Sequence, residues 1–78
     1  MKRSDILVKT IALFATMTDA EEITEESNLI DDLELSSMDV LFVISSLEEE
    51  FGIKIPEAMI RTTETVSDVV EIVCDMLK

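Results

Sequence analysis

Two adjacent serines, Ser36 and Ser37, stand where an acidic segment ends and a strongly apolar one begins. Ser36 lies three residues before Asp39, the spacing of a capping box, so we expect Ser36 to cap a helix that starts at Ser37. The Ser37 hydroxyl then stays free at the first helical position, where unpaired N–H groups and the helix dipole favour an anion. The pattern therefore predicts Ser37 as a site for a phosphodiester. Serine is also a common cap, so a purely structural role for both residues is the alternative.

The segment after these serines has the period of an amphipathic helix. We predict a helix over Ser37–Phe51 that ends at the only glycine, Gly52, in a left-handed cap. The side chains expected to face the core are Val40, Val43, Ile44, Leu47 and Phe51.

An earlier helix and a long connector precede the serines. Ser4 and Asp5 indicate a helix start, and apolar residues at helical spacing predict a helix from Asp5 to about Met17. Residues 18–35 are acidic and lack this period throughout. A loop of this length needs apolar anchors in a compact domain. We expect these anchors to be Ile23, Leu29, Ile30 and Leu33.

The chain after Gly52 predicts an extended step and two more helices. Pro56 favours extended backbone before it and a short third helix after it, from Glu57 to about Arg61. Thr65 and Asp68 have capping-box spacing and predict a last helix from Val66 to Leu77. Its expected buried stripe is Val66, Val69, Val70, Val73 and Leu77. The chain is therefore predicted to be all-α: a small four-helix bundle forming one domain over residues 1–78, with a long loop between helices one and two.

The charge excludes several classes of partner. The formal net charge is -12, and no Lys or Arg occurs between Lys9 and Lys54. Without a basic patch, nucleic acid and anionic membrane surfaces are not expected partners, whereas basic proteins are. No apolar run approaches the roughly 20 residues of a membrane span, and no signal peptide is apparent. With a single cysteine, these features predict a cytoplasmic monomer that does not insert into membranes.

The sequence offers no catalytic constellation. It has no histidine, so Ser-His-Asp and Cys-His sites are excluded. Cys74 lies among acids with no nearby cation, which predicts an inert structural thiol. The acids Asp31, Asp32 and Glu34 lack the glycine and spacing of a calcium loop, so no metal site is predicted. We expect the chain not to be an enzyme.

At this point the sequence resembles the acyl carrier protein family. The resemblance rests on the run Asn28-Leu29-Ile30-Asp31-Asp32-Leu33-Glu34-Leu35-Ser36-Ser37-Met38-Asp39, on Leu47-Glu48-Glu49-Glu50-Phe51-Gly52-Ile53-Lys54-Ile55-Pro56, and on Thr65-Val66-Ser67-Asp68. It implies that Ser37 carries 4′-phosphopantetheine, donated by coenzyme A and attached by a phosphopantetheinyl transferase. The family's loop typically reads Asp-Leu-Gly-x-Asp-Ser-Leu; here Glu34 stands at the Gly position, Ser36 at the second Asp and Met38 at the Leu.

The resemblance also implies where partner enzymes dock. In the family, acids on the second helix meet basic patches on acyl-processing enzymes, which makes Asp39, Glu48 and Glu49 the candidates here. Met38 and Leu41 near Ser37 are candidate apolar contacts. Phe42 occupies a position that is often acidic in members serving fatty acid synthesis, so an exposed Phe42 indicates a different partner.

The sequence thus predicts a carrier that holds acyl or aminoacyl groups as thioesters for fatty acid, polyketide or related biosynthesis. One alternative is an unmodified acidic helical adaptor for basic proteins, which explains the charge but not the order of the loop motifs. Another is a carrier that has lost its modification, suggested by Ser36 in place of the usual Asp.

Overall fold

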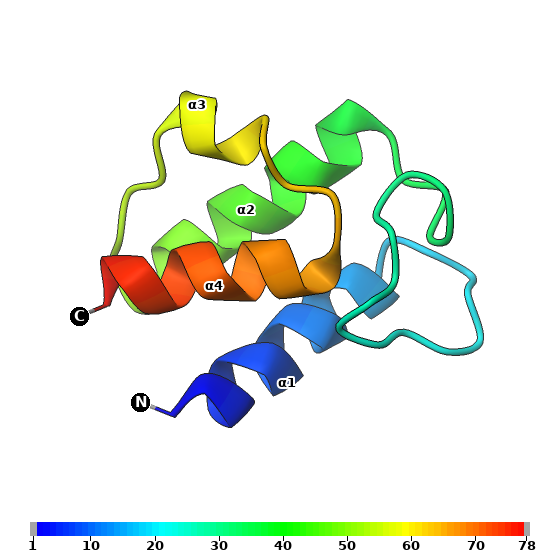
Figure 1. Cartoon of the computed structure of the whole chain (residues 1–78), viewed down its shortest axis with the longest axis horizontal. Coiled ribbons are helices and arrows are strands. Elements are labelled where there is room, and N and C mark those ends of the chain that lie inside the picture. Colours follow the sequence, from blue (N-terminus) through cyan, green and yellow to red (C-terminus); the bar gives the residue numbers. More distant parts are fainter. Residues whose placement is uncertain (1, 78) are drawn as a thin grey trace.

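The computed structural model describes residues 2–77, which contain four helices and no strand. The helices are α1 (Arg3–Ala15), α2 (Ser37–Phe51), α3 (Glu57–Ile60) and α4 (Val66–Met76). α1 contacts both α2 and α4, and the short α3 connects the far end of α2 to α4 (Figure 1). The predicted helical class, the long loop after the first helix and the short third helix are all confirmed.

The core between α1, α2 and α4 is almost entirely aliphatic. The predicted inner face of α2 is buried at Val40, Val43, Ile44 and Leu47, and Phe51 is half-buried. α1 contributes Ile6 and Phe14, and the largest part of the α4 contribution is a valine stripe. That stripe consists of Val66, Val69, Val70 and Val73. The fold therefore rests on the burial of branched apolar side chains, with Phe14 as the only aromatic ring in the buried set.

The bounds predicted for the first helix were wrong by two residues at each end. The helix starts at Arg3 rather than Asp5, because the Lys2 carbonyl accepts hydrogen bonds from the N–H groups of Asp5 at 3.0 Å and Ile6 at 3.2 Å. It ends at Ala15 rather than Met17, because Thr16 and Met17 donate to carbonyls only three residues back. Such tighter turns are a common way for a helix to end.

The last helix corrects one member of its predicted stripe. α4 starts at Val66 with the expected capping box, in which Thr65 Oγ1 accepts from the Asp68 N–H at 3.3 Å and Asp68 accepts in return. Leu77, however, is 39% exposed rather than buried. It is the residue after the helix end, beyond the last buried valine, so nothing in the core covers it.

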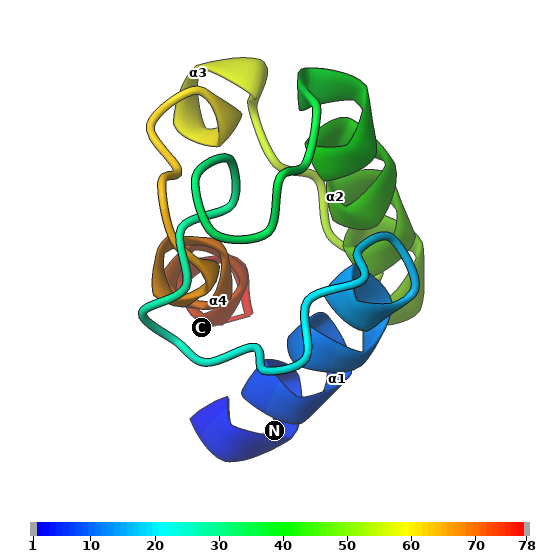
Figure 2. The same cartoon turned by 90° about the vertical axis from the view of Figure 1, so that its right-hand side faces the viewer.

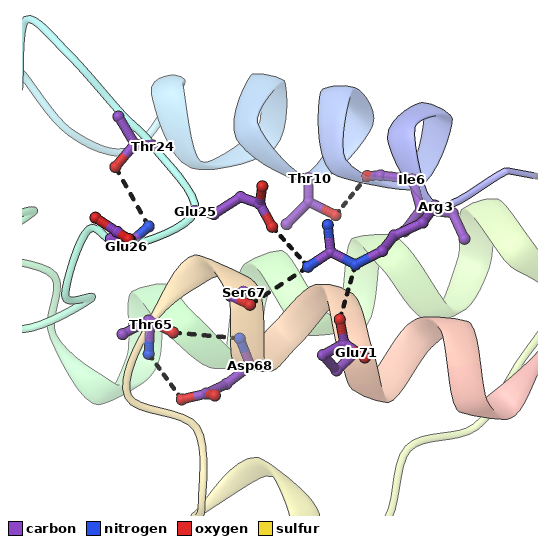
Figure 3. Close-up of polar contacts among 10 residues, drawn as sticks. All are labelled: Arg3, Ile6, Thr10, Thr24, Glu25, Glu26, Thr65, Ser67, Asp68 and Glu71. Carbon is purple, nitrogen blue, oxygen red and sulfur yellow. Dashed lines mark hydrogen bonds and ion pairs between the residues drawn. The ribbon is translucent and has the colours of Figure 1, made fainter.

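A cluster around Arg3 joins three segments that are distant in the sequence. The Arg3 guanidinium lies 2.6 Å from a Glu25 carboxylate oxygen in the connector and 2.7 Å from Glu71 on α4. Figure 3 shows both carboxylates and Ser67 converging on it. Hydrogen bonds, first with Glu25 and then with Glu71, raise the pKa of Arg3 above its ordinary value. The cluster ties the start of α1 to the connector and α4.

Candidate functional site

The two serines take the separate positions that their spacing predicts. Ser36 is the N-cap of α2: its Oγ accepts from the Asp39 N–H at 3.2 Å, and the Asp39 carboxylate accepts from the Ser36 N–H at 3.0 Å. Both halves of the capping box are therefore present. Ser37 becomes the first helical residue, and its side chain is exposed.

The Ser37 hydroxyl is available for chemistry. Within residues 2–77, no hydrogen-bond partner engages its side chain, because the neighbouring serine already performs the capping. The first-turn N–H of Asp39 is satisfied by Ser36, whereas helix geometry leaves the N–H groups of Ser37 and Met38 without an intrahelical acceptor. These groups and the helix dipole favour a phosphate ester on this oxygen. An exposed, uncommitted hydroxyl fits the attachment of 4′-phosphopantetheine.

The connector fixes the position of the α2 N-terminus through buried side chains and backbone hydrogen bonds. Leu29, Leu33 and Leu35 are each at most 3% exposed, and the Leu35 N–H donates to the Leu29 carbonyl at 3.0 Å. A further pair of backbone bonds joins the connector to the start of α4: Leu29 donates to Glu64 at 2.9 Å, and Val66 donates to Ser27 at 3.2 Å. Figure 2 shows the connector passing α4 before it turns into α2. The buried leucines and the backbone hydrogen bonds to the start of α4 thus fix the connector that leads into Ser37.

One predicted anchor of the connector was wrong. Ile30 is 54% exposed instead of packing into the core, while Ile23 is half-buried against it. The cause is a turn at Asn28, whose Oδ1 accepts from the N–H groups of Ile30 at 2.9 Å and Asp31 at 2.8 Å. This turn buries Leu29 and leaves Ile30 outside.

Ile30 instead helps to form a pocket beside Ser37. The pocket has a volume of about 380 Å³ and lies between the connector, the start of α2 and α3, which sit close together in Figure 2. Its wall is mostly apolar, with two charged residues from the α3 region. The lining residues are Leu29, Ile30, Ser37, Val40, Leu41, Glu57, Ile60, Arg61 and Thr63. Sequence reasoning missed the roles of Ile30, Ile60 and Arg61, because only the fold brings α3 next to Ser37.

The three predicted acidic contacts differ in how free they are. Asp39 is half-buried and committed to the capping box. Glu48 is also half-buried, and its carboxylate accepts from the Ile55 N–H at 2.7 Å, so it holds the segment after α2. Glu49 is exposed and is the most available of the three.

The three predicted apolar contacts all reach the surface. Met38 is 74% exposed, Phe42 61% and Leu41 39%. Together with Met17, Asp39 and Ser45 they line a shallow groove of about 430 Å³ next to the start of α2. An exposed phenylalanine beside an exposed methionine forms an apolar surface of the kind that marks contact sites.

The remaining chemistry-bearing groups form no site of their own. Cys74 is half-buried on α4. In the part of the chain that the structure describes, no three His, Cys, Asp or Glu side chains are placed to hold a metal ion. Over the same residues, no helix has both the length and the apolar character needed to cross a bilayer.

Comparisons with known proteins agree with this arrangement. A family model described as "Phosphopantetheine attachment site" matches residues 6–73. An acyl carrier protein of Saccharopolyspora erythraea is 38% identical over 58 residues, which are 74% of this chain and 61% of that protein. The match thus spans less than two thirds of that relative. An acyl carrier protein of Thermosynechococcus vestitus is 36% identical over 75 residues, which are 94% of this chain and 93% of that protein.

A solved structure shows the same fold. The crystal structure of an acyl carrier protein from Thermotoga maritima superposes with a TM-score of 0.84 and 26% identity, covering 99% of this chain and 92% of that one. The family model and these relatives together show that the chain belongs to the phosphopantetheine attachment-site family of acyl carrier proteins, which are carriers with covalent 4′-phosphopantetheine rather than enzymes.

Proposed function

We propose that Ser37 is the attachment residue and that the chain carries acyl or aminoacyl groups between partner enzymes. Ser37 Oγ attacks the β-phosphorus of coenzyme A on a phosphopantetheinyl transferase, forming a phosphodiester as the pyrophosphate bond breaks. Adenosine 3′,5′-bisphosphate leaves, and the hydroxyl proton passes to a base of the transferase. The attached group supplies a terminal thiol that holds the cargo as a thioester.

The observation that supports this proposal most is the division of labour between the two serines. Ser36 caps the helix by accepting from the Asp39 N–H. Esterification of the exposed Ser37 hydroxyl therefore breaks no capping hydrogen bond. The family match gives the class of cofactor, and the exposed, unbonded hydroxyl at the helix N-terminus supports Ser37 Oγ as the attachment atom.

Intact-mass measurement tests the attachment residue. The chain is incubated with coenzyme A and a broad-specificity transferase, and we expect a gain equal to one phosphopantetheine arm. Ser37→Ala abolishes this gain, whereas the matched Ser36→Ala variant retains it. No gain with several transferases, or a gain that survives in Ser37→Ala, overturns the assignment and favours the unmodified adaptor.

The apolar pocket beside Ser37 supports a second part of the proposal, which is that the carrier shelters part of its cargo. The wall contributed by Ile30, Leu41 and Ile60 is continuous with the serine. No residue of α3 is fully buried, so this short helix is the wall best able to move aside. The cargo class, whether fatty acyl, polyketide or aminoacyl, is to be identified by capture of partners with the modified form.

We further propose that partner enzymes dock on the outer face of α2. The net charge of -12 attracts basic surfaces over long range, and the groove with Met38 and Phe42 adds an apolar contact. Phe42 then selects partners that present an apolar side chain within a basic rim. We place this encounter in the cytoplasm, with the carrier acting as a monomer.

Two substitutions separate the apolar contribution from the electrostatic one. Phe42→Ala is expected to weaken binding to a cognate partner by about tenfold or more, with little change in salt dependence. Glu49→Gln is expected to slow association by a few-fold at low salt and to have little effect at high salt. Val8→Ala serves as the control, since Val8 is 67% exposed on α1 and outside the groove. Equal effects of Phe42→Ala and Val8→Ala would exclude the groove as the docking surface.

A further inference from the structure

Among residues 2–77, Arg61 is the only basic residue that lines the pocket beside Ser37. It follows the last residue of α3 as its C-cap. The rest of the lining is apolar except for Ser37, Thr63 and Glu57. Arg61 and Glu57 give this mostly apolar pocket one charged end, on the side across from α2.

The contact that Arg61 makes in the unmodified protein is a weak one. Its guanidinium lies 3.1 Å from a Glu57 carboxylate oxygen one turn earlier, and the two side chains are 78% and 74% exposed. An exposed pair of this kind contributes little, because solvent screens it and both side chains lose freedom. By contrast, Arg3 meets two carboxylates from separate segments, and Lys9 joins Glu50 across two helices. Of these three cations, Arg61 is therefore the one whose carboxylate partner another anion replaces most easily.

We propose that Arg61 binds an anionic group of the arm attached to Ser37 and thereby positions the arm along the apolar pocket. The anion is either the phosphodiester or a carboxylate at the end of the cargo. Guanidinium matches both groups with two parallel hydrogen bonds. The Glu57 carboxylate competes for the same guanidinium N–H groups. It therefore pairs with Arg61 when the anion of the arm is absent. This inference rests on the proposed attachment at Ser37.

The two members of the ion pair have effects of opposite sign. Removing Arg61 removes the anion's partner and frees the arm, whereas removing Glu57 removes the competitor and holds the arm more firmly. If the pair served only to stabilise α3, both substitutions would loosen α3 and change the arm in the same direction. The sign therefore distinguishes anion binding from a structural role.

Access to the thiol of the arm measures this positioning. The modified protein is prepared with Cys74→Ala, so that one thiol remains, and is alkylated with a small uncharged reagent. If Arg61 binds the phosphodiester, Arg61→Gln raises the alkylation rate about two- to fivefold, and Glu57→Gln lowers it by a similar factor. Arg61→Lys is expected to fall between Arg61→Gln and the parent, since lysine keeps the charge but not the fork. Lys54→Gln is the matched control, because it removes one exposed positive charge outside the pocket.

The source of the anion follows from loading the arm. Thioesters of a neutral acyl group and of a dicarboxylic half-acid of equal length are compared for their rates of hydrolysis. If Arg61→Gln changes the alkylation rate of the free thiol and the hydrolysis rates of both thioesters, the anion is the phosphodiester. If it changes only the hydrolysis rate of the half-acid thioester, the anion is the cargo carboxylate. No dependence in any of the three forms overturns the inference.

A separate probe distinguishes failure of this inference from failure of the attachment proposal. Ser37→Cys, in the Cys74→Ala background, is alkylated with 3-bromopropylphosphonate, which places a phosphonate on the same residue without a transferase. We expect the Arg61 side-chain Nε–H signal in the NMR spectrum to shift on this reaction, and to shift further in Glu57→Gln. An unchanged Arg61 signal in this protein rules out the phosphodiester as the anion, even if the transferase modifies Ser37 normally.

Discussion

Ser36 and Asp39 satisfy each other's backbone at the start of α2, with reciprocal hydrogen bonds of 3.2 and 3.0 Å. Two adjacent serines therefore have different roles. Ser36 caps the helix, so the Ser37 hydroxyl is not needed as a capping group. The same device recurs at Thr65 and Asp68 at the start of α4, where the next residue is Val66 and no hydroxyl is presented.

Substitutions of the two serines should therefore affect stability unequally. Ser36→Ala is expected to lower the free energy of unfolding by about 1 kcal/mol, because the Asp39 N–H loses its acceptor. Ser37→Ala should change it by less than about 0.5 kcal/mol. Urea denaturation followed by circular dichroism measures both. A larger loss in Ser37→Ala than in Ser36→Ala would contradict the assignment of the cap.

Ser36→Asp tests a different property of the same position. Asp caps helices about as well as Ser, so stability should be nearly unchanged. Faster modification of this variant by a transferase would show that the enzyme reads this position; an unchanged rate would show that it does not.

Glu34 is expected to be a strained residue of the loop. Its φ is 53°, the only positive φ among the non-glycine residues of the described chain. Residues with a Cβ are disfavoured in this conformation, and the family resemblance places a glycine at this position. Glu34→Gly should raise the free energy of unfolding by about 0.5–1 kcal/mol. Glu34→Gln controls for the lost charge, and a gain in Glu34→Gln equal to that in Glu34→Gly would assign the effect to charge instead of conformation.

Leu47 lies at the centre of the aliphatic core and has no exposed surface. Leu47→Ala is expected to cost about 2–5 kcal/mol through lost burial and the cavity left behind. Small domains have only about 5–15 kcal/mol of stability, so this variant should be partly unfolded at moderate temperature. Thermal unfolding by circular dichroism provides the test, with Val8→Ala as the surface control. Similar melting temperatures for the two variants would show that the core is not packed as described.

We expect Arg3 to stabilise the folded state equally from about pH 6 to about pH 9. Its pKa is raised in the folded state by Glu25 and then by Glu71, so its contribution is complete below the unfolded pKa and is lost only as pH rises through the folded one. That loss falls in strongly alkaline solution. Arg3→Gln should therefore lower the melting temperature by the same amount at about pH 6 and at about pH 9.

Salt provides the second readout for Arg3. The difference between Arg3→Gln and the parent should shrink from low salt to about 1 M salt, where screening is nearly complete over a few ångströms. Lys54→Gln is the matched control for loss of one positive charge. A difference that persists unchanged at high salt would mean that the Arg3 side chain acts by packing rather than by ion pairing.

The sequence by itself determined the features that depend on residues close together in the chain. The two capping boxes, the span Ser37–Phe51 and the left-handed Gly52 follow from side chains and backbone within one or two turns. The tertiary structure alone decided what depends on distant segments. The packing of the connector and α3 against α2 created the pocket with Arg61 and placed Ile30 in its wall. Helix starts obey local hydrogen bonding, whereas burial and charge pairing depend on which segments the whole fold brings into contact.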